Sequence, residues 1–178
     1  MAEDAKSRGT ATPLATYLQT LVGTDVTRVA GTAVYLSIDP QAVPSALLGN
    51  LAHNKVLHRQ LLFVKVTTRD TPFVDERERV SSSTIARDSF RVEVTYGFKD
   101  DVDLPRSLQR CALFGGDFDP AKASYFLSRT TVVPTPGSGM WLWREKLFAS
   151  MVQNVGSLAV SLKLPAERVV ELGTQVDI

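Results

Sequence analysis

The stretch GTAVYLSIDPQAVPSALLGNLAHNKVLHRQLLFVKVTT, from Gly31 to Thr68, decides the fold of this chain. It begins with Gly31 to Ile38, a short apolar run of β-branched and aromatic residues. It ends with a second such run, Gln60 to Thr68. Short continuous apolar runs are typical of strands that are covered on both faces. We therefore predict two central strands.

A helix is predicted between these strands. Pro44 suits the start of a helix, and Leu47, Leu48 and Leu51 fall on one side, where they would pin the helix to the sheet. Asn54 is the predicted helix end, in a left-handed conformation. The order strand, helix, strand indicates a right-handed crossover, and hence a sheet that is at least partly parallel.

A hairpin is predicted further along the chain. The runs 79–85 and 90–98 are separated by a short polar turn, and the second alternates apolar and polar residues. Such a short connection requires antiparallel pairing. The predicted fold class is α/β, a single domain with a mixed sheet that combines the βαβ unit and this hairpin, with helices packed on the sheet.

The second half of the chain predicts two helices and two extended segments. Residues 103–114 are a predicted helix, and residues 124–134 are extended before a turn at 134–139. Apolar residues recur at steps of three or four from Met140 to Leu162, which indicates a long helix that Pro165 closes. The last segment, 168–178, is a predicted strand that Gly173 breaks.

The chain begins with small polar residues and then a short amphipathic helix behind Pro13. We expect residues 1–28 to be a tail and a short helix, and residues 29–178 to be the α/β domain.

Composition narrows the function classes. Twenty basic and nineteen acidic residues leave the chain almost neutral, which disfavours a nucleic-acid partner. The single cysteine, Cys111, suits a reducing compartment and a small buried role. No apolar run approaches the roughly 20 residues that span a bilayer, and no secretory signal is visible. The expected location of the chain is cytoplasmic.

Both histidines lie near the end of the predicted helix, as His53 and His58, with Asn54, Lys55 and Arg59 around them. Their five-residue spacing does not fit the i and i+4 ligand pattern of zinc helices, and no nucleophile or orienting carboxylate lies nearby. We therefore predict no metal site and no catalytic residues. The favoured interpretation is that these cations follow the last helical turn and stabilise its unpaired carbonyls.

Two other segments carry residues that could bind an ion. Asp117 and Asp119 resemble a Mg²⁺-like pair, but Asp119 before Pro120 fits a helix N-cap better. Gly137 and Gly139 precede a predicted helix that carries Arg144, an arrangement that can hold an anion.

The ligand candidates are therefore the residues His53, Asn54, Lys55, His58, Gly137, Gly139 and Arg144. No cofactor is predicted.

Six blocks of sequence carry a family resemblance. They are TRVAGTAVYLS (27–37), VPSALLGNLAHNKVLH (43–58), FRVEVTYGF (90–98), FDPAKASYFLSR (118–129), WREKLFASMVQN (143–154) and RVVELGTQVDI (168–178). In words, order and spacing the chain resembles the C-terminal cytosolic region of Kup-type (KUP/HAK/KT) potassium uptake permeases. The chain departs from the family pattern at single positions. It has Gly49 where the family often has histidine, and Arg59 where the family usually has glutamate. It has Ser128 where glycine is usual and Trp141 where alanine is common.

The resemblance implies a parent protein that takes up potassium by symport with protons, through membrane spans that precede this region. It also implies that residues 1–28 link to that transmembrane region and that residues 29–178 are a cytosolic domain. It implies a non-enzymatic regulatory and dimerisation domain on the cytoplasmic side of the cell membrane, with its own permease and a second copy as partners. The alternative hypothesis is a sensor for a nucleotide such as cyclic di-AMP. A phosphoesterase that uses His58 with Asp117 or Asp119 is the third hypothesis.

Overall fold

The computed structural model describes residues 13–111, 118–133 and 158–177. Its helices are α1 (Leu14–Val22), α2 (Ser45–Asn54), α3 (Leu104–Gln109), α5 (Leu158–Ser161) and the 3-10 turn η2 (Ala166–Arg168). Its strands are β1 (Thr27–Leu36), β2 (Val56–Arg69), β3 (Val80–Ala86), β4 (Ser89–Gly97), β5 (Ser124–Val133) and β6 (Val169–Asp177).

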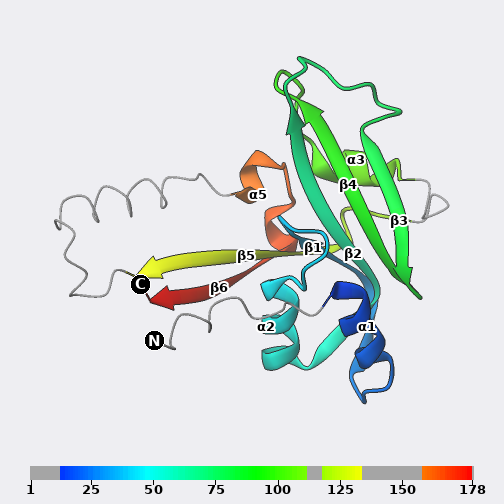
Figure 1. Cartoon of the computed structure of the whole chain (residues 1–178), viewed down its shortest axis with the longest axis vertical. Coiled ribbons are helices and arrows are strands. Elements are labelled where there is room, and N and C mark those ends of the chain that lie inside the picture. Colours follow the sequence, from blue (N-terminus) through cyan, green and yellow to red (C-terminus); the bar gives the residue numbers. More distant parts are fainter. Residues whose placement is uncertain (1–12, 112–117, 134–157, 178) are drawn as a thin grey trace, which may run out of the picture.

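These strands form one mixed sheet in the order β3-β4-β2-β1-β5-β6 (Figure 1). β1 is parallel to β2 on one side and to β5 on the other. β4 is parallel to β2, and β6 is parallel to β5. β3 alone is antiparallel to its neighbour, β4. The predicted α/β class with a mixed sheet is confirmed.

The predicted βαβ unit is present as β1, α2 and β2, although its first strand starts earlier, at Thr27. Asn54 is the last residue of α2, and its amide donates to Asn50 Oδ1 at 2.8 Å. The left-handed residue is Lys55, with φ of 54°. The prediction of a helix end at Asn54 is confirmed, but the left-handed position was wrong by one residue.

The face of α2 that touches the sheet also differs from the predicted face. Ala46, Leu47 and Asn50 are buried, whereas Leu48 is 44% exposed and Leu51 is partly buried. The prediction that Leu48 pins the helix was wrong. A buried polar side chain, Asn50, takes its place, because two acceptors on the sheet satisfy the amide.

Tyr35 lies at the centre of this packing. Its ring stacks on Phe63 of β2 with centroids 5.7 Å apart, and on Phe126 of β5 with centroids 4.8 Å apart. The amide nitrogen of Asn50 donates to the Tyr35 hydroxyl at 3.3 Å and to the carbonyl of Val56 at 3.0 Å. Burial raises the pKa of the Tyr35 hydroxyl far above its ordinary value.

The two faces of the sheet carry separate cores. On one face, Leu14 and Leu18 of α1 join Leu47 of α2 over Tyr35 and Phe63. On the other face, α3 and α5 cover the sheet through the residues Leu104, Leu108, Ala159, Leu162 and Leu164. Cys111 is buried in this second core, as predicted. The alternation of side chains along each strand assigns neighbouring residues to opposite cores.

The predicted hairpin is confirmed as β3 and β4, joined at Arg87 and Asp88. Asp88 has φ of 57°, the left-handed conformation that such tight turns require. The exposed residues Ser81 to Ser83 lie on β3, at the edge of the sheet.

The second half of the chain differs from the prediction at several points. α3 ends at Gln109, and most of the long helix predicted from Met140 lies outside the described residues. Its final turn is α5, after which Lys163 adopts φ of 55°. β6 runs through Gly173 without a break, because parallel pairing with β5 continues there, so that predicted break was wrong.

Gly97 ends β4 against the connection between β2 and β3. A Cβ at Gly97 would lie 2.5 Å from the carbonyl oxygen of Pro72 and 2.6 Å from the nitrogen of Phe73. Real Cβ atoms do not approach backbone so closely, so the connection could not keep this position over a larger residue. Glycine is therefore required at this site for steric reasons.

We expect Gly97→Ala to lower the free energy of unfolding by about 1–3 kcal/mol, the usual cost of overpacking. Gly173→Ala is the matched control, because nothing lies within 4 Å of its added Cβ. Urea unfolding of the two variants and the parent chain measures the difference. Equal midpoints for all three would contradict this packing.

Candidate functional site

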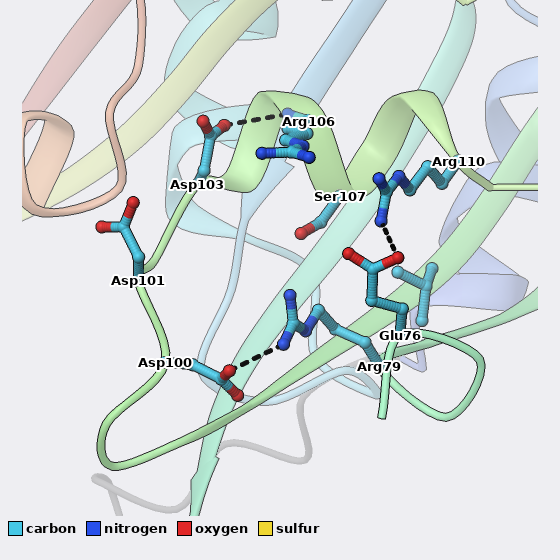
Figure 2. A pocket seen from close by; sticks show the side chains of 9 residues that line it. Glu76, Arg79, Asp100, Asp101, Asp103, Arg106, Ser107 and Arg110 are labelled. Carbon is cyan, nitrogen blue, oxygen red and sulfur yellow. Dashed lines mark hydrogen bonds and ion pairs between the residues drawn. The ribbon is translucent and has the colours of Figure 1, made fainter. Parts of the chain in front are cut away.

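A polar pocket of about 280 Å³ lies between the connection that follows β2, the end of β4 and helix α3 (Figure 2). Its lining residues are Glu76, Arg79, Val80, Asp100, Asp101, Asp103, Arg106, Ser107 and Arg110. Seven of its nine lining residues are charged. It is therefore the candidate site.

Asp100 organises one side of the pocket. Its carboxylate accepts from the backbone N–H of Gly97 at 2.7 Å and from that of Val74 at 3.0 Å. Arg79 Nη2 donates to the other carboxylate oxygen at 2.8 Å (Figure 2). The two backbone bonds and the arginine hold the pKa of Asp100 below its usual value. Asp100 thus ties the 70–79 connection to β4.

Arg79 is largely buried, with 18% of its side chain exposed. Its guanidinium also donates to the carbonyl of Val74 at 3.0 Å and lies over the ring of Tyr96, 5.3 Å from the centroid. Its Nε is buried and makes no hydrogen bond to any described residue. The Tyr96 hydroxyl shares a hydrogen bond of 2.8 Å with Ser107 of α3. Arg79 and Tyr96 therefore link the connection to the helix.

The other side of the pocket is more open. Glu76 pairs with Arg110 at 2.5 Å, and both side chains are about half exposed or more (Figure 2). The hydrogen bond and charge of Arg110 lower the pKa of Glu76, and the charges of Arg106 and Arg79 add to this effect. Because solvent screens such pairs, this contact holds the connection only weakly.

Asp103 and Asp101 complete the lining. The Asp103 carboxylate accepts from the backbone N–H of Arg106 at 3.0 Å and so caps α3. Asp101 pairs with Lys163 from the segment after α5. The lining residues carry four acidic and three basic groups, one negative charge in excess. The pocket therefore has no general preference for an anion.

The ligand candidates around α2 do not form one site. His53 lies in the last turn of α2 and is exposed, and Lys55 is the exposed left-handed residue that follows it. These two positions agree with the predicted role at the helix end. His58 and Arg59 lie within β2 instead, so the interpretation that they stabilise the helix carbonyls was wrong. The strand begins at Val56, immediately after the left-handed residue.

His58 is half-buried in the sheet. Its ring meets the edge of Phe126 with centroids 5.9 Å apart, and its Nδ1 is buried without a hydrogen-bond partner in the described residues. Burial lowers the pKa of this imidazole, which favours its neutral form. Opposite it, β1 bulges between Val29 and Thr32, where Gly31 has φ of 103°.

The remaining candidates have different outcomes. Gly137, Gly139, Arg144 and Asp117 lie outside the described residues.

Asp119 begins a turn and not a helix. Its carboxylate accepts from the N–H of Ala121 at 3.0 Å and pairs with Lys122 at 3.3 Å. The capping interaction was therefore expected correctly, but the helix was not. In the described ranges, no group of three or more His, Cys, Asp or Glu side chains is placed to hold a metal ion.

The pocket itself was missed at the sequence level. Its signal was the density of charges at 75–79 (DERER) and 99–103 (KDDVD), two runs that flank the ends of neighbouring elements. Such runs usually form solvated surfaces. The antiparallel pairing of β3 with β4 places Arg79 beside Thr95, and the parallel pairing of β2 with β4 brings the rest of the first run to the end of β4.

Comparison with known proteins then identifies the family. Residues 30–178 match the family model described as the K+ potassium transporter C-terminal domain. The chain belongs to this family. The match covers the sheet from Ala30 of β1 onward, so the fold described above is the fold of a K+ potassium transporter C-terminal domain.

The curated relatives that the chain matches are also potassium transport proteins by name. The chain is 49% identical over 171 residues to the "Probable potassium transport system protein Kup" of Nitrosospira multiformis, and the alignment covers 96% of this chain and 27% of that relative. It is 47% identical over 175 residues to the protein of the same name from Verminephrobacter eiseniae, covering 98% of this chain and 28% of the relative. The chain thus spans about a quarter of the relatives it matches.

No solved structure matches the chain. None of the described helices is long and apolar enough to cross a membrane.

Two departures from the family pattern have a local structural account. Ser128 of β5, at a usual glycine position, accepts from the N–H of Ala46 at 2.9 Å and from the Ser45 hydroxyl at 2.7 Å. It therefore satisfies one of the unpaired N–H groups at the start of α2. Gly49, at a frequent histidine position, leaves room for Leu172, whose Cδ1 would lie 3.4 Å from an added Cβ.

We expect Asp100→Asn to lower the urea midpoint at pH 7 several times more than Glu78→Gln, the matched control. The Asp100 side chain is 8% exposed and accepts three hydrogen bonds, whereas that of Glu78 is 71% exposed and meets Arg69 only at 3.9 Å.

The same variant tests the pH dependence. Because folding lowers the pKa of Asp100, its contribution to stability is present above the unfolded value of about 3.9 and is lost as the pH falls through the folded value. Asp100→Asn should therefore lose less stability between pH 7 and pH 3 than the parent chain. An acid response identical to the parent's would contradict the assignment.

Proposed function

We propose that this chain is a regulatory and dimerisation domain of a potassium transporter and that it lies on the cytoplasmic side of the membrane. The observation that carries the proposal is the family match over residues 30–178, together with relatives named as potassium transport proteins that are about four times longer. In this proposal potassium passes through another part of the transporter, and the domain itself does not transport.

A non-enzymatic role is part of this proposal. The charged groups of the pocket are mostly engaged with one another: Asp100 with Arg79, Glu76 with Arg110, and Asp101 with Lys163. The Asp100–Arg79 contact fastens the 70–79 connection to the end of β4, whereas the other two pairs are exposed and add little. Catalytic acids and bases are usually held near a free cavity with perturbed pKa values suited to proton transfer. Lowered pKa values of paired carboxylates fit a structural role better.

Nucleotide sensing is the weaker form of the proposal. A nucleotide brings several negative charges, and the pocket lining already carries one negative charge in excess. Arg110 could meet a phosphate only if its ion pair with Glu76 were broken. The regulatory and assembly role is therefore preferred here over a nucleotide site in this pocket.

We expect cells whose transporter lacks the region from residue 13 onward to grow more slowly at limiting potassium than cells with the complete transporter. The reason is that the domain controls or assembles the transport part. Growth rate at several potassium concentrations is the measurement, and an immunoblot of membrane fractions controls for transporter abundance. Equal growth at equal abundance would end the proposal.

The assembly part of the proposal rests on β6. It is the last strand of the sheet, so one side of its backbone has no neighbouring strand among the described residues. Proteins usually protect such edges or pair them. Val170 on this strand is 37% exposed, which adds apolar surface beside the free edge. A second copy could extend the sheet through this strand.

We expect the 178-residue chain to scatter light as a dimer at about 100 μM, within the range of weak symmetric contacts. Val170→Lys should shift it toward the monomer, because a charge on an edge strand discourages pairing. Val22→Lys is the control, since Val22 is 74% exposed at the far end of α1. A strict monomer at this concentration would contradict dimerisation through this domain.

A further inference from the structure

β2 and β4 finish at the same end of the sheet, at the top of Figure 1. Each of the two connections that follow these strands carries an exposed aromatic ring. Phe73 is 66% exposed and Phe98 is 58% exposed. We define the aromatic tip as residues 70–74 and 97–99, which carry these two rings. The residue after Phe73 in this connection, Val74, is only 6% exposed, so the connection buries one apolar side chain and leaves its neighbour, Phe73, in solvent.

The tip is held rigidly. The N–H of Phe98 donates to the carbonyl of Thr71 at 3.0 Å, and the N–H of Lys99 donates to the carbonyl of Pro72 at 2.9 Å. Gly97 lies directly against Pro72 and Phe73. The Asp100 carboxylate accepts from the N–H groups of Val74 and Gly97, the residues next to the two rings. The two rings are therefore presented from a fixed backbone and not from a loose loop.

Acidic residues lie close to both rings in the sequence. Within three residues of Phe73 or Phe98 the chain has five acidic residues and one basic residue, Lys99. The five are Asp70, Asp75, Glu76, Asp100 and Asp101.

Asp100 is neutralised by the largely buried Arg79. Glu76 and Asp101 have only exposed ion pairs, which solvent screens. Asp70 and Asp75 form no ion pair with the described residues. Lys99 Nζ lies 6.0 Å from the centroid of the Phe98 ring. The tip thus combines two exposed rings and one lysine with an acidic rim, in which carboxylates outnumber cations, a composition expected of a surface that meets a cationic partner.

We propose that the aromatic tip is a docking surface for a basic, apolar loop on the cytoplasmic side of the transporter's membrane-embedded part. This inference rests on the proposed function, which places the domain beside that part. Cytoplasmic loops of membrane proteins carry an excess of Lys and Arg, which complements the acidic rim. Their apolar ends, next to the membrane spans, complement the two rings.

Two other occupants fit less well. An anionic lipid surface attracts basic segments, and the acidic rim would oppose it. A second copy of the same tip would bring two acidic rims together, and like charges disfavour that contact. The charge of the rim therefore distinguishes the loop from both.

The test is photo-crosslinking in the complete transporter in native membranes. The photoreactive residue p-benzoylphenylalanine replaces Phe73 or Phe98, and in the control it replaces Ile38, which is 95% exposed on another part of the domain. Mass spectrometry identifies the crosslinked peptides. The expected product joins position 73 or 98 to a Lys- or Arg-containing loop between membrane spans. Products with lipid only, with the tip of a second copy, or no more abundant than at Ile38 would overturn the proposal.

Charge reversal sharpens the test. With the crosslinker at position 98, Asp70→Lys together with Asp75→Lys should reduce the loop product by about fivefold or more, because the rim would then repel the loop. Both carboxylates are exposed, and unchanged thermal unfolding of the 178-residue chain with the two substitutions confirms that the domain still folds. An unchanged yield would contradict the role of the rim.

The outcome is separable from that of the proposed function. If removal of the domain slows growth but no loop product forms, the regulatory proposal stands and the docking surface is wrong. If the loop product forms and removal of the domain has no effect on growth, the docking surface stands and the regulatory proposal is wrong.

Discussion

The stack of Phe63, Tyr35 and Phe126 is the interaction on which the rest of the fold depends. It places one aromatic ring on each of the three central strands, β2, β1 and β5, at paired positions of the register. A slip of one residue in any of these strands would move its ring to the opposite face. Asn50 adds the fourth element, because its amide joins α2 to the Tyr35 hydroxyl and to the start of β2. The stack therefore fixes both the register of the three strands and the position of the crossover helix α2 on the sheet.

Sequence patterns predicted what is local. The apolar run that contains Val34 and Tyr35 is buried on both faces, and the alternation from Phe90 onward marked the hairpin. They could not predict the positions of β5 and β6, since parallel partners come from distant segments whose order no local pattern encodes. The face of α2 was mistaken for a related reason. Leucine was assumed to be buried at every position of the stripe, whereas the sheet offers acceptors that favour Asn50 and leaves Leu48 exposed.

The polar pocket could not be predicted from local sequence patterns either, because its residues come from distant segments. Asp100 and Arg79 are 21 residues apart, and no motif connects them. Their pairing follows from the long parallel contact of β2 with β4, which runs to Arg69 and Gly97 and brings the following connection onto the end of β4. The two histidines, by contrast, stand out in the sequence but form no site together. His53 is exposed at a helix end, and His58 packs on Phe126 within the sheet.

Asp100 joins the pocket to the aromatic tip. One carboxylate oxygen holds the N–H groups beside Phe73 and Phe98, and the other meets Arg79, which packs on Tyr96 and through it reaches Ser107 of α3. A partner that displaces either ring must strain the hydrogen bonds of Asp100. A movement of α3 must change the position of Arg79 and hence its hydrogen bond to the same carboxylate. Coupling between distant surfaces requires such a continuous set of packed and hydrogen-bonded groups with a partner at one end. The contacts from the tip to α3 and, through Asp101 and Lys163, to the segment before β6 form such a set. In a transporter domain, this set would connect docking at one end of the sheet to assembly at the other.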